Sequence, residues 1–240
     1  MRDILTIPFG NEGSLIISSD NSGAIGMKEG DLVQVPYETL AYYSLRVAAM
    51  ECMAAGGEPI SVVLQNFCGD EHWEELVRGI RKGLHELELA QIPITGSTES
   101  NFQLNQSAIG VFIVGKQHIR GTNEVYDYNE NWKLAVIGVP LVGNEVIEQE
   151  QLVVPLSIFQ QLIRLNHGII WPVGSKGILY ELNQMFEQER FTKEQVITEL
   201  DIDKSSGPAT CFMMAYLDDM EEKIKEIAGE YFHAMKIARR

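Results

Sequence analysis

The segment from residue 15 to residue 59 constrains this chain more than any other. An apolar run, LIISS at residues 15–19, leads directly into an acid and a glycine-bearing turn, DNSGAIG at residues 20–26. Further along, a helix of small side chains, AAMECMAAGGEP at residues 48–59, carries the acid Glu51. Mg²⁺ binds one or two protein carboxylates together with phosphate oxygens, and small residues let a polyphosphate approach the backbone. The pattern therefore indicates nucleotide chemistry without a P-loop.

The charge balance narrows the class of partner. The 240 residues include 34 acidic and 19 basic side chains, which gives a net charge of −15. So acidic a surface argues against nucleic acid or an anionic membrane as the main partner. A nucleotide remains compatible with it, because a bound metal ion neutralises phosphate locally. The length is enough for a sizeable core in one large or two small domains.

Targeting signals and cysteine patterns are absent from the sequence. No apolar run is long enough for a signal peptide or a membrane span, so we expect a cytoplasmic protein. Cys52, Cys68 and Cys211 have no paired ligand spacing and leave an odd thiol. We expect them to be buried and reduced.

The predicted elements alternate irregularly, which favours an α+β fold. The predicted strands are 15–19, 60–65, 93–95, 107–114, 134–139 and 210–215. The predicted helices are 36–55, a long helix from residue 70, 156–166, 175–189 and 218–231. A polar, acidic stretch at 116–131 is the best candidate boundary. It divides the chain into a domain at 1–118 and a second domain at 119–240.

Glu51 has two interpretations. Spacings of three and four place it on one helix face with Ala41, Ser44, Ala48 and Ala55. It is either a solvent-facing acid on a helix that packs closely through small residues, or a metal ligand.

Asp20 has a stronger pattern. A strand that ends in an acid and a glycine turn places a carboxylate at the edge of a cleft. Aspartate and asparagine also begin turns for purely local reasons, so both interpretations stay open. Asn21, Ser22 and Gly23 either cradle a phosphate or complete the turn.

A third polar segment follows the strand predicted at 93–95. The backbone at Gly96 and the hydroxyls of Thr95, Ser97 and Thr98 are suited to bind phosphate or metal-bound water, and Glu99 follows them. The alternative is an ordinary polar connection between strands.

Two further patterns are rejected. Residues 110–117, GVFIVGKQ, have the spacing of a P-loop but lack its Ser/Thr, and their β-branched and aromatic residues predict a strand. The five histidines have no zinc-helix spacing, and there is no Gly-x-Ser-x-Gly motif to pair with one of them.

Taken together, the three segments resemble the superfamily of aminoimidazole ribonucleotide synthetase, thiamine-monophosphate kinase, selenophosphate synthetase and the hydrogenase-maturation carbamoyl-dehydrating protein. Asp20 matches that family's aspartate in a strand-terminal turn. Glu51 matches the acid five residues before a Gly-Gly/Ala-x-Pro helix end, with glutamate where aspartate is usual. Residues 95–98 match a glycine-rich loop, with Ser97 where an acid is common. Glu99 is the candidate to replace that metal contact.

The resemblance implies ATP and Mg²⁺ in the N-terminal domain of a homodimer whose strands join into a barrel. Asp20 and Glu51 would be the catalytic metal ligands, and residues 21–23 and 95–99 would contact the nucleotide. The second half resembles a shortened α+β C-terminal domain, in which residues 174–182, GSKGILYEL, match the family's glycine-plus-helix segment.

Within the superfamily, the chain has no cysteine near either end and is short. The run SDNSGAIG at 19–26 looks most like the α-ribazole kinases of cobalamin salvage. That likeness implies phosphorylation of the ribose 5′-hydroxyl of α-ribazole or a similar nucleoside. The alternatives are an ATP-dependent synthetase or ligase, and a non-catalytic ATP-sensing homologue. For the general base, Asn66, Asp70 and Glu99 are candidates by location alone.

Overall fold

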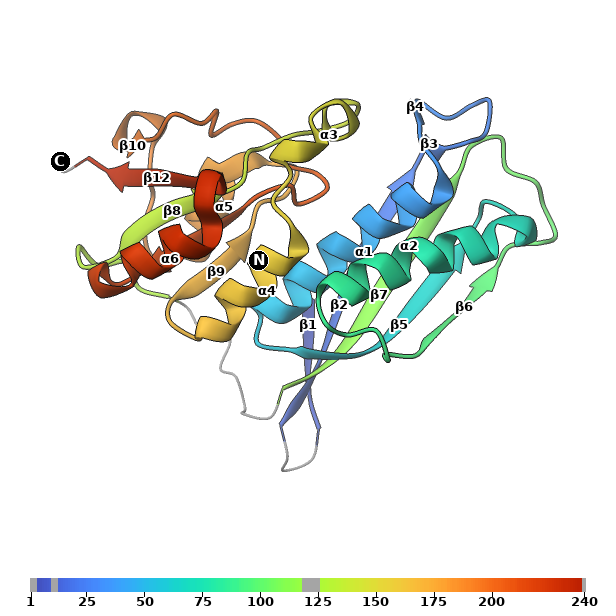
Figure 1. The fold of residues 1–240 in the computed structure, drawn as a ribbon, viewed down its shortest axis with the longest axis horizontal. Coiled ribbons are helices and arrows are strands. Elements are labelled where there is room, and N and C mark those ends of the chain that lie inside the picture. Colours follow the sequence, from blue (N-terminus) through green and yellow to red (C-terminus); the bar gives the residue numbers. More distant parts are fainter. Residues whose placement is uncertain (1–3, 10–12, 118–125, 239–240) are drawn as a thin grey trace. The chain divides into compact units, whose positions relative to one another are not determined.

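The computed structural model describes residues 4–9, 13–117 and 126–238. The chain divides into two compact units, one containing residues 4–117 and the other residues 126–238 (Figure 1). Each unit combines an antiparallel or mixed sheet with helices, which confirms the predicted α+β class. The predicted boundary between residues 118 and 119 lies outside the described residues.

The N-terminal unit is built on a five-stranded sheet. Its order is β1 (Ile4–Pro8), β2 (Ser14–Gly23), β7 (Ala108–Gln117), β5 (Glu58–Asn66) and β6 (Ile94–Thr98). All neighbours are antiparallel except β5 and β6, which are parallel. Because β1 and β6 are its edges, the sheet formed by the described strands is open and not a closed barrel. The P-loop-like segment at 110–117 is part of β7, as predicted.

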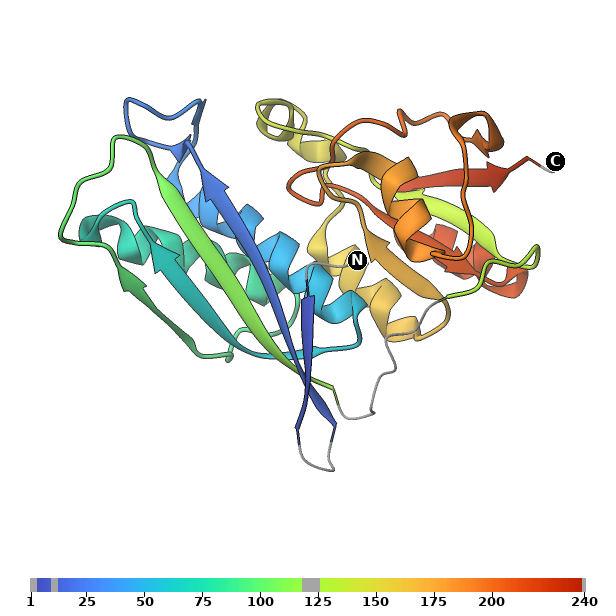
Figure 2. The same cartoon turned by 180° about the vertical axis from the view of Figure 1, so that it is seen from behind.

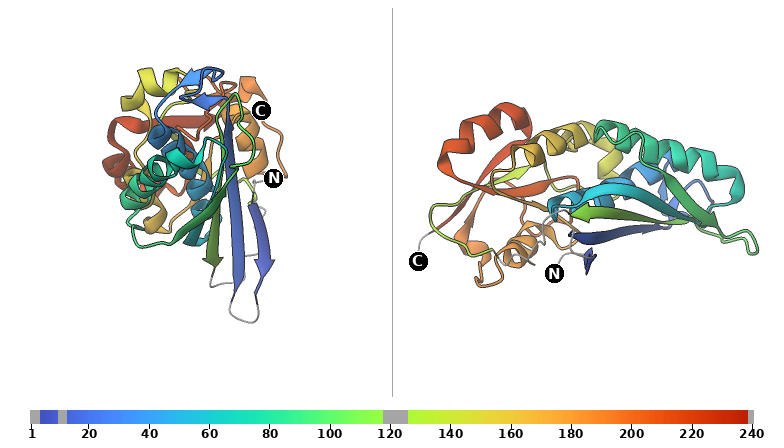
Figure 3. Two further views of the ribbon diagram at one scale, coloured as in Figure 1. Left: turned by 90° about the vertical axis from the view of Figure 1, so that its right-hand side faces the viewer. Right: turned by 90° about the horizontal axis from the view of Figure 1, so that it is seen from below.

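Two helices cover one face of this sheet, α1 (Tyr37–Ala54) and α2 (Trp73–Glu86). They form a second layer beside the strands (Figure 3). Gly79 allows α2 to approach α1, because a Cβ there would collide with the Glu38 carbonyl. Gly115 allows β7 to approach α1 closely, because a Cβ there would collide with the Cys52 sulfur. The predicted helix at 36–55 is confirmed, with Pro36 and Ala55 as its flanking residues.

The opposite face of the sheet carries no helix of this unit (Figure 2). We call it the open face; its apolar side chains are Leu5, Ile7, Leu15, Ile17, Val63, Phe112 and Val114. Leu5 is 56% exposed, and Ile7 and Phe112 are each 38% exposed. The short parallel pair β3 (Ile25–Gly26) and β4 (Val33–Gln34) and the 3-10 turn η1 (Asp70–His72) complete the unit.

The C-terminal unit contains a second five-stranded sheet, with every neighbouring pair antiparallel. Its order is β10 (Val196–Ile197), β12 (Phe232–Ile237), β8 (Lys133–Ile137), β11 (Phe212–Tyr216) and β9 (Ile169–Pro172). Its helices are α3 (Glu145–Glu148), α4 (Leu156–Leu165), α5 (Gly177–Met185) and α6 (Glu221–Ala228). The 3-10 turns are η2 (Glu150–Leu152), η3 (Lys193–Gln195), η4 (Asp218–Met220) and η5 (Gly229–Tyr231).

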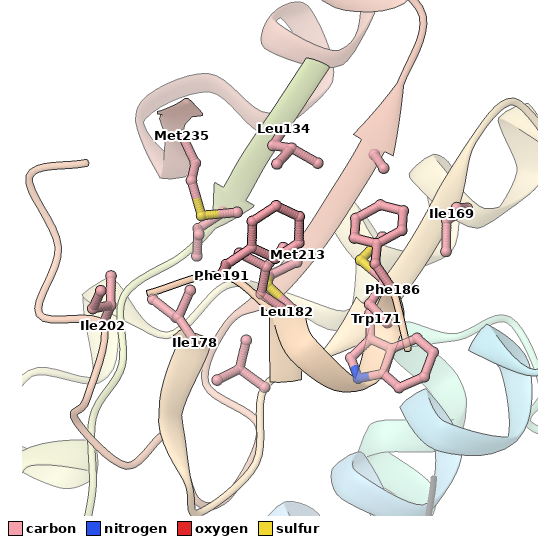
Figure 4. Close-up of a cluster of buried hydrophobic side chains, with 14 of the residues drawn as sticks. Leu134, Ile169, Trp171, Ile178, Leu182, Phe186, Phe191, Ile202, Met213 and Met235 are labelled. Carbon is pink, nitrogen blue, oxygen red and sulfur yellow. The ribbon is translucent and has the colours of Figure 1, made fainter. Parts of the chain in front are cut away.

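The core of this unit lies on the α5 side of the sheet. Figure 4 shows Trp171, Phe186 and Phe191 packed with Leu182 and Met213 in a buried apolar cluster. On the other side, Phe159 of α4 meets Phe212 of β11 edge to face, with ring centroids 5.2 Å apart.

Three strands of this unit, β9, β10 and β12, were not predicted, and two helices are shorter than predicted. α5 ends at Met185, and α6 ends at Ala228 before the chain returns as β12. β9 and β10 have only four and two residues, and the sheet partners of all three strands are distant in sequence. Such pairings are set by tertiary contacts and not by local pattern.

Candidate functional site

Asp20 lies inside a strand, which corrects the prediction of a turn at residues 20–26. β2 continues to Gly23 and pairs with β7 at every step, from Asp20 opposite Val111 to Gly23 opposite Ala108. The ladder extends this far because β7 supplies a partner for each residue. Turn-forming residues at 20–23 are therefore held in extended conformation by their neighbour strand.

Alternation along β2 places Asp20 on the face covered by α1. Ser18 and Ser22, two residues to either side, have the same orientation. The Ser18 hydroxyl donates to the Ala48 carbonyl of α1 at 2.7 Å. The hydroxyls of Ser22 and Ser44 lie 2.8 Å apart. Asp20 is thus bracketed by two hydrogen bonds that join β2 to α1.

Glu51 is half-buried on the same helix and shares the face of Ser44 and Ala48. The two hydrogen bonds place Asp20 opposite the point of α1 that lies midway between Ser44 and Ala48. Glu51 is five residues beyond that point, which corresponds to roughly 7.5 Å along the helix axis. Helical Cα–Cβ bonds tilt toward the N-terminus, which from Glu51 is the direction of Asp20. The structure therefore brings these two acids to one helix–strand interface.

The third predicted segment is also strand and not loop. Residues 95–98 belong to β6 and pair with β5, with Gly96 opposite Leu64 and Thr98 opposite Asn66. Asp20, Val111, Leu64 and Gly96 form one row across the sheet. Three strand spacings separate its ends, or about 14 Å. Within this unit, residues 95–98 and Asp20 are therefore not in contact.

The predicted nucleotide contacts also divide between the two faces of the sheet. Gly96 faces α2, where a Cβ would collide with the Leu64 carbonyl and approach the Trp73 ring. Asn21, Thr95 and Ser97 are exposed and alternate onto the open face.

The three candidate bases have different surroundings. Asn66 is fully buried. Its amide nitrogen donates to the Gly69 carbonyl at 2.8 Å and to the Thr98 hydroxyl at 3.1 Å. Its amide oxygen accepts from Cys68 N–H. Glu99 caps a turn, because one carboxylate oxygen accepts from the N–H groups of Asn101 and Phe102. Asp70 is exposed at the start of η1. These contacts give Asn66 and Glu99 structural roles.

A buried acid that the sequence analysis missed lies near the end of β2 and the start of β7. Asp31 is 8% exposed, and its carboxylate accepts from Lys28 N–H, from Ser107 N–H and from the Ser107 hydroxyl. Burial opposes ionisation, but these hydrogen bonds outweigh it and lower the pKa of Asp31 below its ordinary value. The Tyr37 hydroxyl extends the network to Ser107 at 3.0 Å. In the sequence, KEGD at 28–31 has the composition of a surface turn, so nothing distinguished this acid.

The three cysteines are buried, as predicted. Burial raises the pKa of the Cys52 thiol to about 12, and burial also raises the pKa of Cys68. Neither is a thiolate at neutral pH, so neither is an activated nucleophile.

The donor set at Asp20 and Glu51 suits a hard cation. Mg²⁺ takes one or two carboxylates and completes its shell with water and phosphate oxygens. In the described ranges, no cluster of three or more His, Cys, Asp or Glu side chains is arranged to hold a metal ion. Nor does any helix there have the length and apolar character to cross a membrane.

Comparison with known families gives a match to the first unit. Residues 3–117 match the family model described as AIR synthase related protein, N-terminal domain. No curated protein sequence matches the chain significantly.

Solved structures share the fold at low sequence identity. Thiamine monophosphate kinase from Aquifex aeolicus has a TM-score of 0.64 and 10% identity, covering 100% of this chain and 89% of that chain. AaThiL complexed with AMPPCP and TMP has a TM-score of 0.61 and 11% identity, covering 100% and 85%. T. maritima PurL complexed with AMPPCP has a TM-score of 0.59 and 9% identity, covering 97% of this chain and 42% of that one. At these identities the likeness establishes the fold.

Proposed function

We propose that this protein is an ATP- and Mg²⁺-dependent small-molecule kinase that phosphorylates the ribose 5′-hydroxyl of α-ribazole. The observation that supports the proposal is the pair of hydrogen bonds that join β2 to α1 on either side of Asp20, on the helix face that Glu51 shares. A thiamine monophosphate kinase and PurL, both with this fold, were solved with an ATP analogue. The choice of α-ribazole rests on the resemblance of residues 19–26.

The chemistry of phosphoryl transfer suits this site. The reaction depends on positioning and charge neutralisation more than on covalent chemistry by the protein. Asp20 and Glu51 would hold Mg²⁺, which when bound neutralises the charge on the phosphates. A chain with a net charge of −15 needs such a cation, because its own field repels ATP.

The remaining predicted contacts do not converge on the two acids. Gly23, Asn21, Thr95 and Ser97 are exposed on the open face, across the sheet from Asp20, so we do not assign them to the metal-bound phosphates. Glu99 already caps a turn, so we do not assign it to the metal.

We also propose that the protein is a homodimer in which a second copy covers the open face. Exposed apolar side chains gather there, with Leu5 more than half exposed and Phe112 in the middle of β7. A contiguous apolar surface of this kind is typical of an interaction site. Two such sheets facing one another would form the barrel that the superfamily resemblance implies.

The function is tested by supplying the full chain with ATP, MgCl₂ and one acceptor at a time. The acceptors are α-ribazole, adenosine, thiamine and thiamine monophosphate. We expect ADP to form only with an acceptor, fastest with α-ribazole, and mass spectrometry to find one added phosphoryl group on that acceptor.

The rival functions predict different products. A synthetase would consume ATP and release inorganic phosphate. An ATP-sensing homologue would show a thermal shift with Mg-ATP but no acceptor-dependent ADP. Either result contradicts the kinase assignment, and turnover with another acceptor alone contradicts the assignment of α-ribazole.

A further inference from the structure

The two hydrogen bonds that bracket Asp20 lie in the helix–strand interface; that of Ser18 is buried and that of Ser22 is partly buried. Ser18 is 1% exposed and Ser44 is fully buried. Ser18 donates to a backbone carbonyl in the middle of α1, and Ser22 pairs with the Ser44 side chain. Between them, these contacts fix two points of α1 against two points of β2.

These two contacts determine the position of α1 along β2. The two contacts run in opposite sequence directions, since Ser18 meets residue 48 and Ser22 meets residue 44. A slip of α1 by one turn would displace Glu51 by about 5.4 Å relative to Asp20. Apolar packing by the alanines on this face tolerates such a slip far better than hydrogen bonds do, because hydrogen bonds are directional.

We propose that Ser22 and Ser44 are positioning residues for a divalent cation held by Asp20 and Glu51. This inference rests on the proposed function. The hydroxyl pair lies one strand repeat from Asp20 and two helical turns from Glu51, on the face that both acids share. It sets the separation of the two carboxylates, and Ser18 supports it from the other side of Asp20.

The test measures metal affinity directly. Mn²⁺ binding to the full chain is followed by electron paramagnetic resonance in the presence of AMPPCP. Ser22→Ala and Ser44→Ala should each weaken Mn²⁺ binding about tenfold, the range that supporting residues of a metal site show. The double variant should bind no more weakly than the worse single variant, because both substitutions remove one contact.

Matched variants separate positioning from general stability. Ser22→Thr keeps the hydroxyl and should restore Mn²⁺ affinity to within about twofold of the unsubstituted chain. Ser19→Ala removes the hydroxyl of the residue next to Asp20, on the open face, and should leave Mn²⁺ affinity unchanged. If the alanine variants lower the melting temperature but bind Mn²⁺ normally, the inference is wrong.

Asp20→Asn makes the failure of the inference distinguishable from failure of the proposed function. Loss of Mn²⁺ binding in Asp20→Asn, with normal binding in the serine variants, overturns the positioning role and leaves the metal site intact. Equal Mn²⁺ binding by Asp20→Asn and the unsubstituted chain overturns the metal site itself, and the positioning role with it.

Discussion

Asp31 and Ser107 are 76 residues apart in the chain, yet the Asp31 carboxylate accepts both the backbone N–H and the side-chain hydroxyl of Ser107, each at 2.7 Å. The first residue of α1, Tyr37, joins the same hydroxyl. This contact ties the β3–β4 segment to the start of β7, at the end of the strand that carries Asp20. One buried acid therefore links the β3–β4 segment, β7 and α1 near the candidate site.

Replacing Asp31 by asparagine should destabilise the protein by about 2 kcal/mol, since hydrogen bonds to a charged group contribute about 1.5–3 kcal/mol. The amide nitrogen of asparagine cannot accept from Lys28 N–H or from the Ser107 hydroxyl. Urea unfolding measures the effect. Glu29→Gln, an exposed acid two residues away, is the control and should change little. Equal stability of the two variants would refute the structural role of Asp31.

The same pair should produce a pH dependence. The folded-state pKa of Asp31 is lowered from 3.8, so its contribution to stability is present above that value and is lost as the pH falls through the folded pKa. The difference in unfolding free energy between the unsubstituted protein and Asp31→Asn should be constant above about pH 5 and shrink below about pH 4. Unfolding curves at several pH values test this, and a difference that grows on acidification contradicts it.

Asp20→Asn and Glu51→Gln should each reduce acceptor-dependent ADP formation by more than about 100-fold, because loss of a supporting residue alone typically costs 10–100-fold. Both substitutions preserve size, so circular dichroism and the melting curve should show a folded protein. The double variant should be no worse than either single variant if both acids bind one metal cluster.

The activity measurement has a matched control in Glu74→Gln, an exposed acid on α2, which should retain full turnover. Normal turnover by Asp20→Asn would remove the basis of the proposed kinase site.

Gly115→Ala should destabilise the protein by about 1–3 kcal/mol, the usual effect of overpacking a well-packed interface. The new methyl group would collide with the Cys52 sulfur, so Cys52→Ala in the same chain should recover part of the loss. Gly110→Ala is the control on the same strand, where the nearest atom to a new Cβ would lie 3.5 Å away. If both alanines are equally tolerated, α1 does not pack as closely on β7 as the structure shows.

Phe112→Lys should convert the proposed dimer to a monomer. It places a charge in the middle of the open face, where desolvation on association would be costly. Sedimentation equilibrium of both proteins measures the change, with Glu74→Lys as a surface control. A monomeric unsubstituted protein, or a variant that still dimerises with unchanged affinity, would contradict the proposed interface.

The positions of the main elements followed from local pattern. Pro36 and Gly56-Gly57 delimited α1, and β-branched residues at 109–114 predicted β7 correctly. Local pattern failed for Asp20 and for residues 95–98, because their turn-forming composition is overridden by pairing with β7 and β5. Asp31 was missed for the opposite reason, since its partner Ser107 is remote in sequence.

By itself, the sequence determined the α+β class, the small-residue face of α1 and the two acids that define the candidate site. These are properties of residue type and periodicity, which act over a few residues. Only the tertiary structure decided which face of β2 Asp20 occupies, how far Glu51 lies from it along α1, and that residues 95–98 lie three strands away. Strand register and helix docking are set by long-range hydrogen bonds and packing, for which no local pattern is sufficient.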